Sequence, residues 1–337
     1  MYEKFFYLRE NPFNITPDPR YLFLSKSHAE AIELMSYGVR RRKGFMLLTG
    51  EVGTGKTTLC RALLGRLPGT TESALILNPV LSDIELLRTI NHDFGLDLRS
   101  DSLKDNLDAL NDFLLKTNVR GGNAVIIIDE AQKLSPRALE MLRLLSNLET
   151  DREKLLQIVM VGQPEFRSKL RMSGLRQLNQ RVIVRHHLEP LDAGDTGGYI
   201  ANRLRVAGAE SRLAFSPSAV RLVHETSHGI PRMINIICDR TLTAAFIDET
   251  RTIGEGTVKK AVLELTREGY VRMPGLAAAA AASPMYLDAG AGGFEGAPFY
   301  ERYIPHIAVS TFAMALAAGF LWIHFVLNNS FLTAYLP

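Results

Sequence analysis

The sequence is poor in cysteine, with only Cys60 and Cys238 among its 337 residues. Both fall in predicted amphipathic helices of different domains, so each is expected to be a small buried apolar side chain rather than half of a disulfide. Neither belongs to a metal-ligand spacing, which argues against a structural zinc site. Such sparse cysteines are typical of a protein in a reducing cytoplasm.

The sequence also lacks a strong net charge. It contains 39 Lys and Arg residues against 36 Asp and Glu residues, which gives a formal net charge of +3 at pH 7. That excess is too small to argue for nucleic-acid binding by charge alone, so a nucleic-acid partner is not expected. The basic run at residues 40–43 is interpreted as cations that complement a helix C-terminus, with contact to nucleic acid or lipid headgroups as the alternative.

What the sequence does contain is a glycine-rich motif, G-x-x-x-x-G-K-[ST], at residues 50–57. The apolar run 45–49 before it is predicted to be a buried strand, and residues 57–67 after it a helix. The glycines permit backbone angles that a Cβ would forbid, so successive N–H groups can turn toward a triphosphate at the positive end of the helix. The predicted phosphate-binding residues are Gly50, Glu51, Val52, Gly53, Thr54, Gly55, Lys56, Thr57 and Thr58.

A second motif follows about seventy residues later, where the apolar strand 124–128 ends in Asp129 and Glu130. The carboxyl ends of parallel strands form the edge at which α/β proteins bind ligands. We therefore expect Lys56 to neutralise the phosphates of ATP, Thr57 and Asp129 to hold Mg²⁺, and Glu130 to polarise the attacking water. A chance glycine turn and a solvated strand end are the plain alternatives, but the two motifs in this order indicate nucleotide hydrolysis.

Hydrophobic periodicity divides the chain into an α/β domain, residues 1–190, and an all-helical lid, residues 191–269. Parallel strands are expected near residues 45–49, 73–77, 124–129, 155–161 and 182–188. Helices are expected between and before them near residues 29–42, 57–67, 83–94, 103–117, 135–148 and 165–171. The helices of the lid are expected near residues 193–207, 217–226, 231–247 and 256–267.

The composition changes near residue 270. Residues 270–303, rich in Ala, Gly and Pro, are expected to be a flexible linker. Residues 304–328 are expected to form one transmembrane helix, because residues 307–327 contain no Asp, Glu, Lys or Arg and would span about 31 Å. A buried core helix is the alternative.

The charges beside this span predict its orientation. Arg272 and Arg302 precede it, whereas the short tail 329–337 carries no charge. The positive-inside rule therefore predicts a single-pass protein with its main domain in the cytoplasm and its short tail across the membrane. The N-terminus is charged early and lacks a long apolar stretch, so a signal peptide is not expected.

Together the motifs resemble those of the AAA+ ATPases, and more narrowly the ExeA/GspA-like group associated with type II secretion and related envelope assemblies. The resemblance covers about residues 1–268 and rests on residues 1–6 (MYEKFF), 11–23 (NPFNITPDPRYLF), 50–58 (GEVGTGKTT), 128–132 (IDEAQ), 161–165 (VGQPE) and 229–232 (GIPR). It implies a P-loop NTPase fold in which helices cover both faces of a parallel sheet and an all-α lid follows. It also implies ATP and Mg²⁺ as ligands, and self-association into a ring, in the manner of a hexamer.

The resemblance further implies roles for residues outside the two motifs. Gln163 falls where the family places its sensor of the γ-phosphate, and Arg232 where it places a second sensor that reaches from the lid. Arg181 or Arg176 is the candidate arginine finger offered to a neighbouring subunit, with Arg181 slightly favoured. Residues 11–13 fall where the family covers the adenine, although an apolar anchor to the core would look the same. For the three arginines, a helix-terminal or solvated position is the alternative.

Several relatives in this group continue beyond the membrane into a peptidoglycan-binding domain, and the nine residues of the predicted tail, 329–337, are too few to fold into one. The expected function is therefore that of a membrane-anchored ATPase that serves a secretion, pilus or polysaccharide-export system through an inner-membrane partner protein. A DNA-binding ATPase resembling transposition-targeting proteins is one alternative, which the apolar span and mild charge disfavour. An ATP-binding scaffold with little turnover is another, which intact Lys56, Asp129 and Glu130 disfavour.

Overall fold

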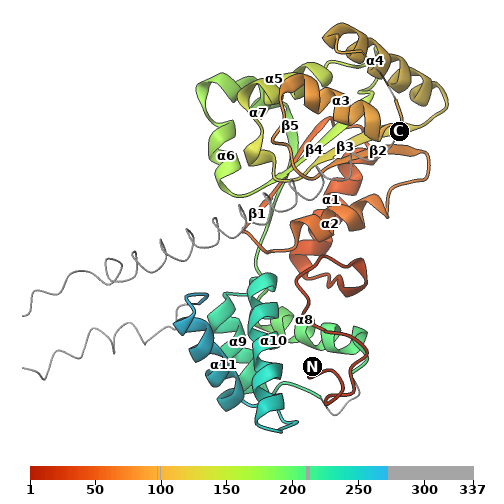
Figure 1. The fold of residues 1–337 in the computed structure, drawn as a ribbon. Coiled ribbons are helices and arrows are strands. Elements are labelled where there is room, and N and C mark those ends of the chain that lie inside the picture. Colours follow the sequence, from red (N-terminus) through yellow and green to blue (C-terminus); the bar gives the residue numbers. More distant parts are fainter. Residues whose placement is uncertain (97, 99, 210–212, 272–337) are drawn as a thin grey trace, which may run out of the picture. The chain divides into compact units, whose positions relative to one another are not determined.

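Five parallel strands form a single sheet in the computed structural model, which describes residues 1–96, 98, 100–209 and 213–271 (Figure 1). The strands are β1 (Phe45–Gly50), β2 (Thr71–Ile76), β3 (Asn123–Ile128), β4 (Leu156–Gly162) and β5 (Val182–Leu188). Their order across the sheet is β2-β3-β4-β1-β5, and every pairing is parallel. Each strand begins and ends within two residues of its predicted bounds, and the α/β fold class is confirmed.

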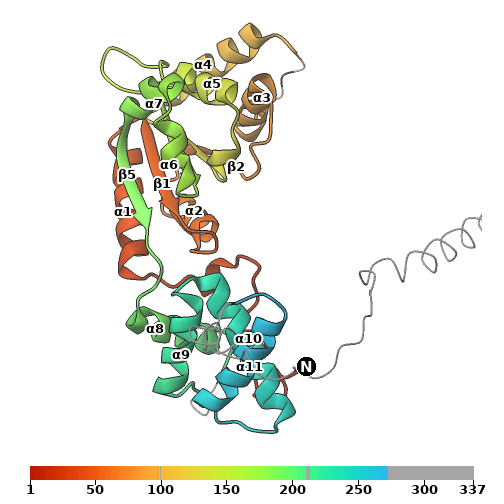
Figure 2. The same ribbon diagram turned by 90° about the vertical axis from the view of Figure 1, so that its left-hand side faces the viewer.

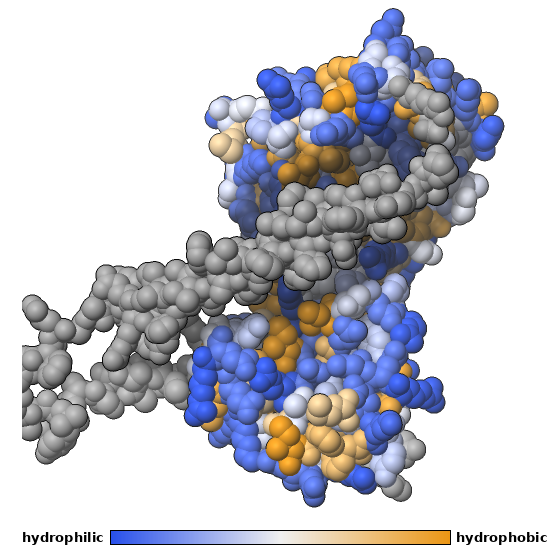
Figure 3. Space-filling model, viewed as in Figure 1, coloured by the Kyte–Doolittle hydropathy of each residue, from blue (hydrophilic) through white to orange (hydrophobic). Residues whose placement is uncertain are grey.

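Helices cover both faces of this sheet because neighbouring residues of each strand point to opposite sides. On one face Met46 and Leu48 pack with α1 (Lys26–Arg40) and α2 (Lys56–Leu64). Phe45 and Leu47 face the other core, which is covered by α3 (Asp83–Asp93), α4 (Leu103–Val119), α5 (Pro136–Leu145), α6 (Glu165–Leu170) and α7 (Arg176–Arg181). Figure 2 shows α1 and α6 on opposite sides of β1. Figure 3 shows that hydrophilic residues occupy most of the visible surface of the described part.

The short helix α7 was not expected from the sequence. Its six residues are too few for periodicity to reveal a helix. Leu175 and Leu178, three residues apart, are buried with Val182 in the core under the sheet. Packing against the sheet therefore determines this segment more than local sequence preference does.

The lid comprises α8 (Ala193–Val206), α9 (Pro217–Ser227), α10 (Pro231–Ile247) and α11 (Glu255–Arg267). The N-terminal residues Tyr2, Phe6 and Phe13 are buried in the same hydrophobic core as these helices. The Tyr2 hydroxyl donates a hydrogen bond to Asp239 of α10. The beginning of the chain thus packs with the lid, although it precedes the α/β strands in sequence.

Side-chain caps fix the start of six α-helices in the described part of the chain. Each capping oxygen accepts a hydrogen bond from a backbone N–H in the first turn, which satisfies a group that the helix itself leaves unpaired. These caps belong to α1, α3, α4, α5, α8 and α9 and are Ser25, Ser82, Ser102, Ser135, Asp192 and Ser216. Helix α2 differs, because it begins after Gly55 with no side-chain cap.

The predicted linker and transmembrane helix lie outside the described residues from residue 272 onward, as does the predicted tail. Among the residues that the structure does describe, no helix combines the length and apolar character that crossing a bilayer requires.

The turn at Gly229 provides a test of how the lid is joined to the sheet. Gly229 has a φ of 70°, and a Cβ there would lie 2.0 Å from the carbonyl oxygen of Leu191. We expect Gly229→Ala to lower the free energy of unfolding by about 2–4 kcal/mol, since both the backbone angle and the contact become unfavourable. Gly256→Ala in α11 is the matched control, because a Cβ at Gly256 would meet no atom within 4 Å. Chemical denaturation of both variants measures the difference, and equal stabilities would contradict the role of this turn.

Candidate nucleotide-binding site

The glycine-rich loop connects the end of β1 to the start of α2, at the carboxyl edge of the sheet. Gly55 has a φ of 95° and Gly53 a φ of 85°, a left-handed region that favours glycine. Since α2 has no side-chain cap, the backbone N–H groups of its first turn are available to an anion. The helix dipole adds partial positive charge at the same end. The loop therefore has the geometry of a phosphate-binding site.

Lys56 is the first residue of α2, where the loop ends, and is only 6% exposed. Its Nζ atom donates hydrogen bonds to the carbonyl oxygens of Gly50 (2.9 Å) and Glu51 (2.8 Å). Burial lowers the pKa of Lys56, while the carboxylates of Asp129 and Glu130 oppose this shift. The structure thus places a cation beside the two carboxylates that the sequence predicted to share its site.

The two predicted metal ligands are in direct contact. The Thr57 hydroxyl donates to Oδ2 of Asp129, whose side chain is only 2% exposed. Oδ1 of Asp129 accepts a hydrogen bond of 2.8 Å from the backbone N–H of Glu130. A hydroxyl and a carboxylate are hard oxygen donors of the kind that Mg²⁺ prefers, so these residues fit the predicted ion.

Glu130 points to a different place from Asp129, although the two are adjacent in sequence. It has a φ of 53°, in the left-handed region that few residues other than glycine adopt. Unlike Asp129, it lines the cavity in front of the loop. The backbone angle therefore separates the two carboxylates, with Asp129 behind Thr57 and Glu130 facing the space where a substrate would bind.

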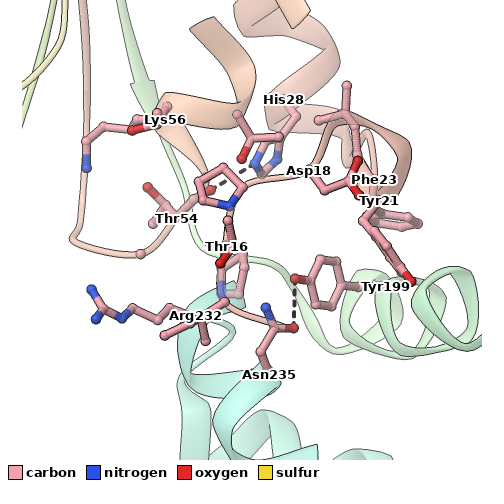
Figure 4. Close-up of a pocket in the computed structure, with 18 of the residues that line it drawn as sticks. Thr16, Asp18, Tyr21, Phe23, His28, Thr54, Lys56, Tyr199, Arg232 and Asn235 are labelled. Carbon is pink, nitrogen blue, oxygen red and sulfur yellow. Dashed lines mark hydrogen bonds between the residues drawn. The ribbon is translucent and has the colours of Figure 1, made fainter. Parts of the chain in front are cut away.

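This cavity has a volume of about 380 Å³. Its walls come from the glycine loop, the N-terminal segment and the lid (Figure 4). Of the predicted site residues, Gly50, Glu51, Asp129, Gln163, Arg176 and Arg181 are not among its lining residues. The predicted residues that do line it are Val52, Gly53, Thr54, Gly55, Lys56, Thr57, Thr58, Glu130 and Arg232.

The N-terminal wall differs in position from the one suggested by the sequence. Phe13 is buried in the lid core, with its ring centroid 6.3 Å from that of Phe215, and does not line the cavity. Residues 11–13 thus include the apolar anchor that was considered as the alternative. The lining is formed instead by residues further along the segment, namely Asn14, Ile15, Thr16, Pro17, Asp18, Tyr21, Leu22 and Phe23.

Arg203 of α8 fastens this N-terminal segment to the lid and was not identified from the sequence. Its guanidinium donates to the carbonyl oxygens of Pro12 and Asn14 and to the Tyr199 hydroxyl. The guanidinium carbon also lies 4.6 Å from the ring centroid of Tyr21, a cation–π distance. Because these partners are scattered along the chain, no local motif marks Arg203.

Arg232 lies in the first turn of α10 and lines the cavity (Figure 4). Its backbone N–H donates to the carbonyl oxygen of Gly53 at 3.2 Å. A Cβ at Gly53 would lie 2.6 Å from the Cβ of Arg232, so the glycine also makes room for the lid. Lid and loop are therefore in contact at this arginine, while its role as a sensor stays a prediction.

The remaining predicted residues lie around the site rather than in the cavity. Gln163 follows the end of β4, and its backbone N–H donates to Oε1 of Gln132 at 3.2 Å. The Arg181 side chain donates to Ser146 (2.6 Å) and Asn147 (2.7 Å) of its own chain, at the end of α5. Arg176 is exposed. A finger must reach a neighbouring subunit, so this geometry favours Arg176 over Arg181, and the assignment stays a prediction.

His28 of α1 is a further lining residue that no sequence motif indicated. Its Nε2 lies 3.0 Å from the carbonyl oxygen of Thr54, and its Nδ1 lies 2.6 Å from the Ser25 hydroxyl. Because a carbonyl can only accept, Nε2 carries the proton in this arrangement. Burial lowers the pKa of His28, whereas the bond to Thr54 and the charge of Asp195 raise it.

The lowered pKa of His28 predicts a loss of stability at mildly acidic pH. As the pH falls below about 6.5, histidine in the unfolded chain gains its proton before the buried His28 does, so protons favour unfolding. The free energy of unfolding should therefore decline between about pH 7.5 and pH 5.5, and it should decline less in His28→Gln. Chemical denaturation at both pH values measures this, and equal declines would assign the effect to other groups.

The two finger candidates should differ in their effects on stability. We expect Arg181→Ala to lower the free energy of unfolding by about 1–3 kcal/mol, since it leaves the partners at the end of α5 without their donor. Arg176→Ala should change it by less than about 0.5 kcal/mol, as for an exposed residue. Denaturation curves of both variants give the comparison, and the reverse order would contradict the placement of these side chains.

Solved structures of low sequence identity share the fold. The ORC2 protein of Aeropyrum pernix superposes with a TM-score of 0.59 at 18% identity, covering 76% of this chain and 71% of that chain. Cdc6p of Pyrobaculum aerophilum gives a TM-score of 0.56 at 17% identity, covering 73% and 70%. At these identities the likeness establishes the fold alone.

Sequence comparison is more specific. Residues 39–170 match the AAA domain family. Over 267 residues, 79% of this chain, the sequence is 48% identical to general secretion pathway protein A of Aeromonas hydrophila. The match covers 49% of that relative, so the chain spans about half of its length. The predicted resemblance is confirmed: the chain contains an AAA domain and is similar to general secretion pathway protein A, and both matches support the predicted ATPase class.

Proposed function

We propose that this chain is a Mg²⁺-dependent ATPase of the bacterial inner membrane that acts in the assembly or operation of a secretion, pilus or polysaccharide-export system. The observation that carries the catalytic part is the contact between Thr57 and Asp129 beside the glycine loop, with Glu130 facing the same cavity. The name of the Aeromonas relative, general secretion pathway protein A, supports the assignment to secretion.

Hydrolysis would proceed by attack of a water oxygen on the γ-phosphorus of ATP while the bond to the β,γ-bridging oxygen breaks, which yields ADP and phosphate. Glu130 would orient this water and accept its proton. Lys56 and the loop N–H groups would bind the phosphate oxygens and stabilise their charge. Held by Thr57 and Asp129, Mg²⁺ would neutralise negative charge on the phosphates.

Residues from the lid and from a second subunit would complete this site. Arg232 would contact the nucleotide from α10, because it lines the cavity and its backbone is bonded to the loop. Gln163 would sense the γ-phosphate from the end of β4. Arg176 would serve as the finger in a ring-shaped oligomer, since it is exposed on its own chain. An arginine supplied in trans stabilises charge only in the assembled ring.

The membrane part of the proposal rests on the apolar run at residues 307–327 and on the arginines that precede it. The anchor would keep the ATPase on the cytoplasmic side, next to an inner-membrane protein of the envelope system. Conformational change driven by ATP would then pass to that partner at the membrane surface.

Replacement of the general base tests the catalytic assignment. We expect Glu130→Gln to lower kcat by about 100-fold or more, because the amide cannot accept the proton of the attacking water. Binding of ATP should persist in this variant, whereas Lys56→Ala should lose it, since a buried cation at the phosphates is removed. Steady-state turnover and equilibrium binding of fluorescent ATP measure the two effects, and chelation of Mg²⁺ should stop turnover of the native chain. Undiminished turnover by Glu130→Gln would refute the assignment.

ATP turnover by the full chain in detergent, measured over a range of protein concentrations with and without duplex DNA, distinguishes the ring ATPase from the DNA-binding alternative. Turnover per molecule should rise with protein concentration as subunits associate, and Arg176→Ala should remove that rise. Duplex DNA should have no effect. Strong stimulation by DNA that weakens with salt would instead favour the transposition-like alternative.

A further inference from the structure

The Gln132 side chain connects Glu130 to Gln163, two predicted site residues that are far apart in the sequence. Its Nε2 donates a hydrogen bond of 2.8 Å to Oε2 of Glu130. Its Oε1 accepts a hydrogen bond of 3.2 Å from the backbone N–H of Gln163. One carboxamide thus bridges the predicted catalytic carboxylate and the residue that follows β4.

The chemistry of both partners fixes the direction of this amide. An ionised carboxylate only accepts, so it must face the NH₂ group of Gln132, and a backbone N–H only donates, so it must face the oxygen. A glutamate at this position would place a second carboxylate beside Glu130, and an apolar side chain would offer neither hydrogen bond. Glutamine supplies a donor and an acceptor at the required reach.

The surroundings of Gln132 keep the bridge in place. A Cβ at Gly162 would lie 2.9 Å from its Oε1, so the glycine at the end of β4 leaves space for the amide. The backbone carbonyl of Gln132 accepts a hydrogen bond of 2.8 Å from Nζ of Lys169, which also donates to Leu134 at 2.6 Å. Helix α6 therefore clamps the turn η2 (Ala131–Lys133) on which Gln132 lies.

We propose that Gln132 is a positioning residue, which holds Glu130 at a fixed place relative to the end of β4 so that one carboxylate oxygen meets the attacking water. Glu130 has a left-handed backbone, and its side chain is only partly buried, so packing alone leaves it freedom to turn. The bridge restricts that freedom through Oε2. This inference rests on the proposed role of Glu130 as the base, and it assigns the alignment of that base to Gln132, two residues further along the chain.

Gln132→Met tests the bridge, because methionine has a similar length and no amide. We expect kcat for ATP to fall about tenfold or more, while the affinity for ATP changes less than about twofold, since only the alignment of the base is lost. Asn118→Ala, which removes an amide from α4 outside the cavity, is the control and should keep the native kcat. Thermal unfolding of each variant checks that the fold is kept. Native turnover by a folded Gln132→Met would overturn the proposal.

A double variant distinguishes this inference from the proposed function itself. If Gln132 acts through Glu130, adding Gln132→Met to Glu130→Gln should cause no further loss of turnover. A further loss would show that Gln132 acts independently and would refute the positioning role. Turnover retained by Glu130→Gln alone would instead refute the proposed base.

Discussion

Helix α2 starts without a capping side chain, and the rest of the site is arranged around that bare helix end. Its first-turn N–H groups need an acceptor, and in a parallel sheet the loop that precedes such a helix opens at the carboxyl edge. Lys56 is bonded to the carbonyls of Gly50 and Glu51, and His28 to that of Thr54. These hydrogen bonds occupy backbone carbonyl oxygens of the loop, so the backbone N–H groups of the loop can face the cavity.

The two adjacent carboxylates illustrate how one backbone angle separates the proposed metal ligand from the proposed base. Asp129 continues the buried end of β3 and is held by Thr57 and by the N–H of its neighbour. The positive φ of Glu130 turns the backbone away from the direction of β3, and Glu130 lines the cavity. Strain of this kind, on the order of 1 kcal/mol or more, persists only where surrounding contacts fix the conformation. Gln132 and the clamp from Lys169 provide such contacts.

The N-terminal segment joins the loop and lid into one cavity. Its first residues are anchored in the lid core, and the residues after Phe13 form one wall of the cavity. Arg203 holds this wall with hydrogen bonds to carbonyl groups and with aromatic faces, which compensate for the cost of burying a guanidinium. The backbone N–H of Arg232 bonds to Gly53, so the lid and the glycine loop are directly linked.

The sequence by itself determined the parallel α/β fold, the helices that follow it and the glycine loop. Apolar periodicity defines strands and helices locally, and a glycine motif needs only its own neighbours to form a loop of this shape. The short helix α7, the cavity wall beyond Phe13 and the bonds of Arg203 and Arg181 came only from the tertiary structure. Gln132 likewise lies in a recognised motif, IDEAQ, but its link to Gln163 crosses from one strand end to the next. Such contacts depend on which distant segments the fold brings together. A local sequence pattern does not show which segments will be neighbours in space.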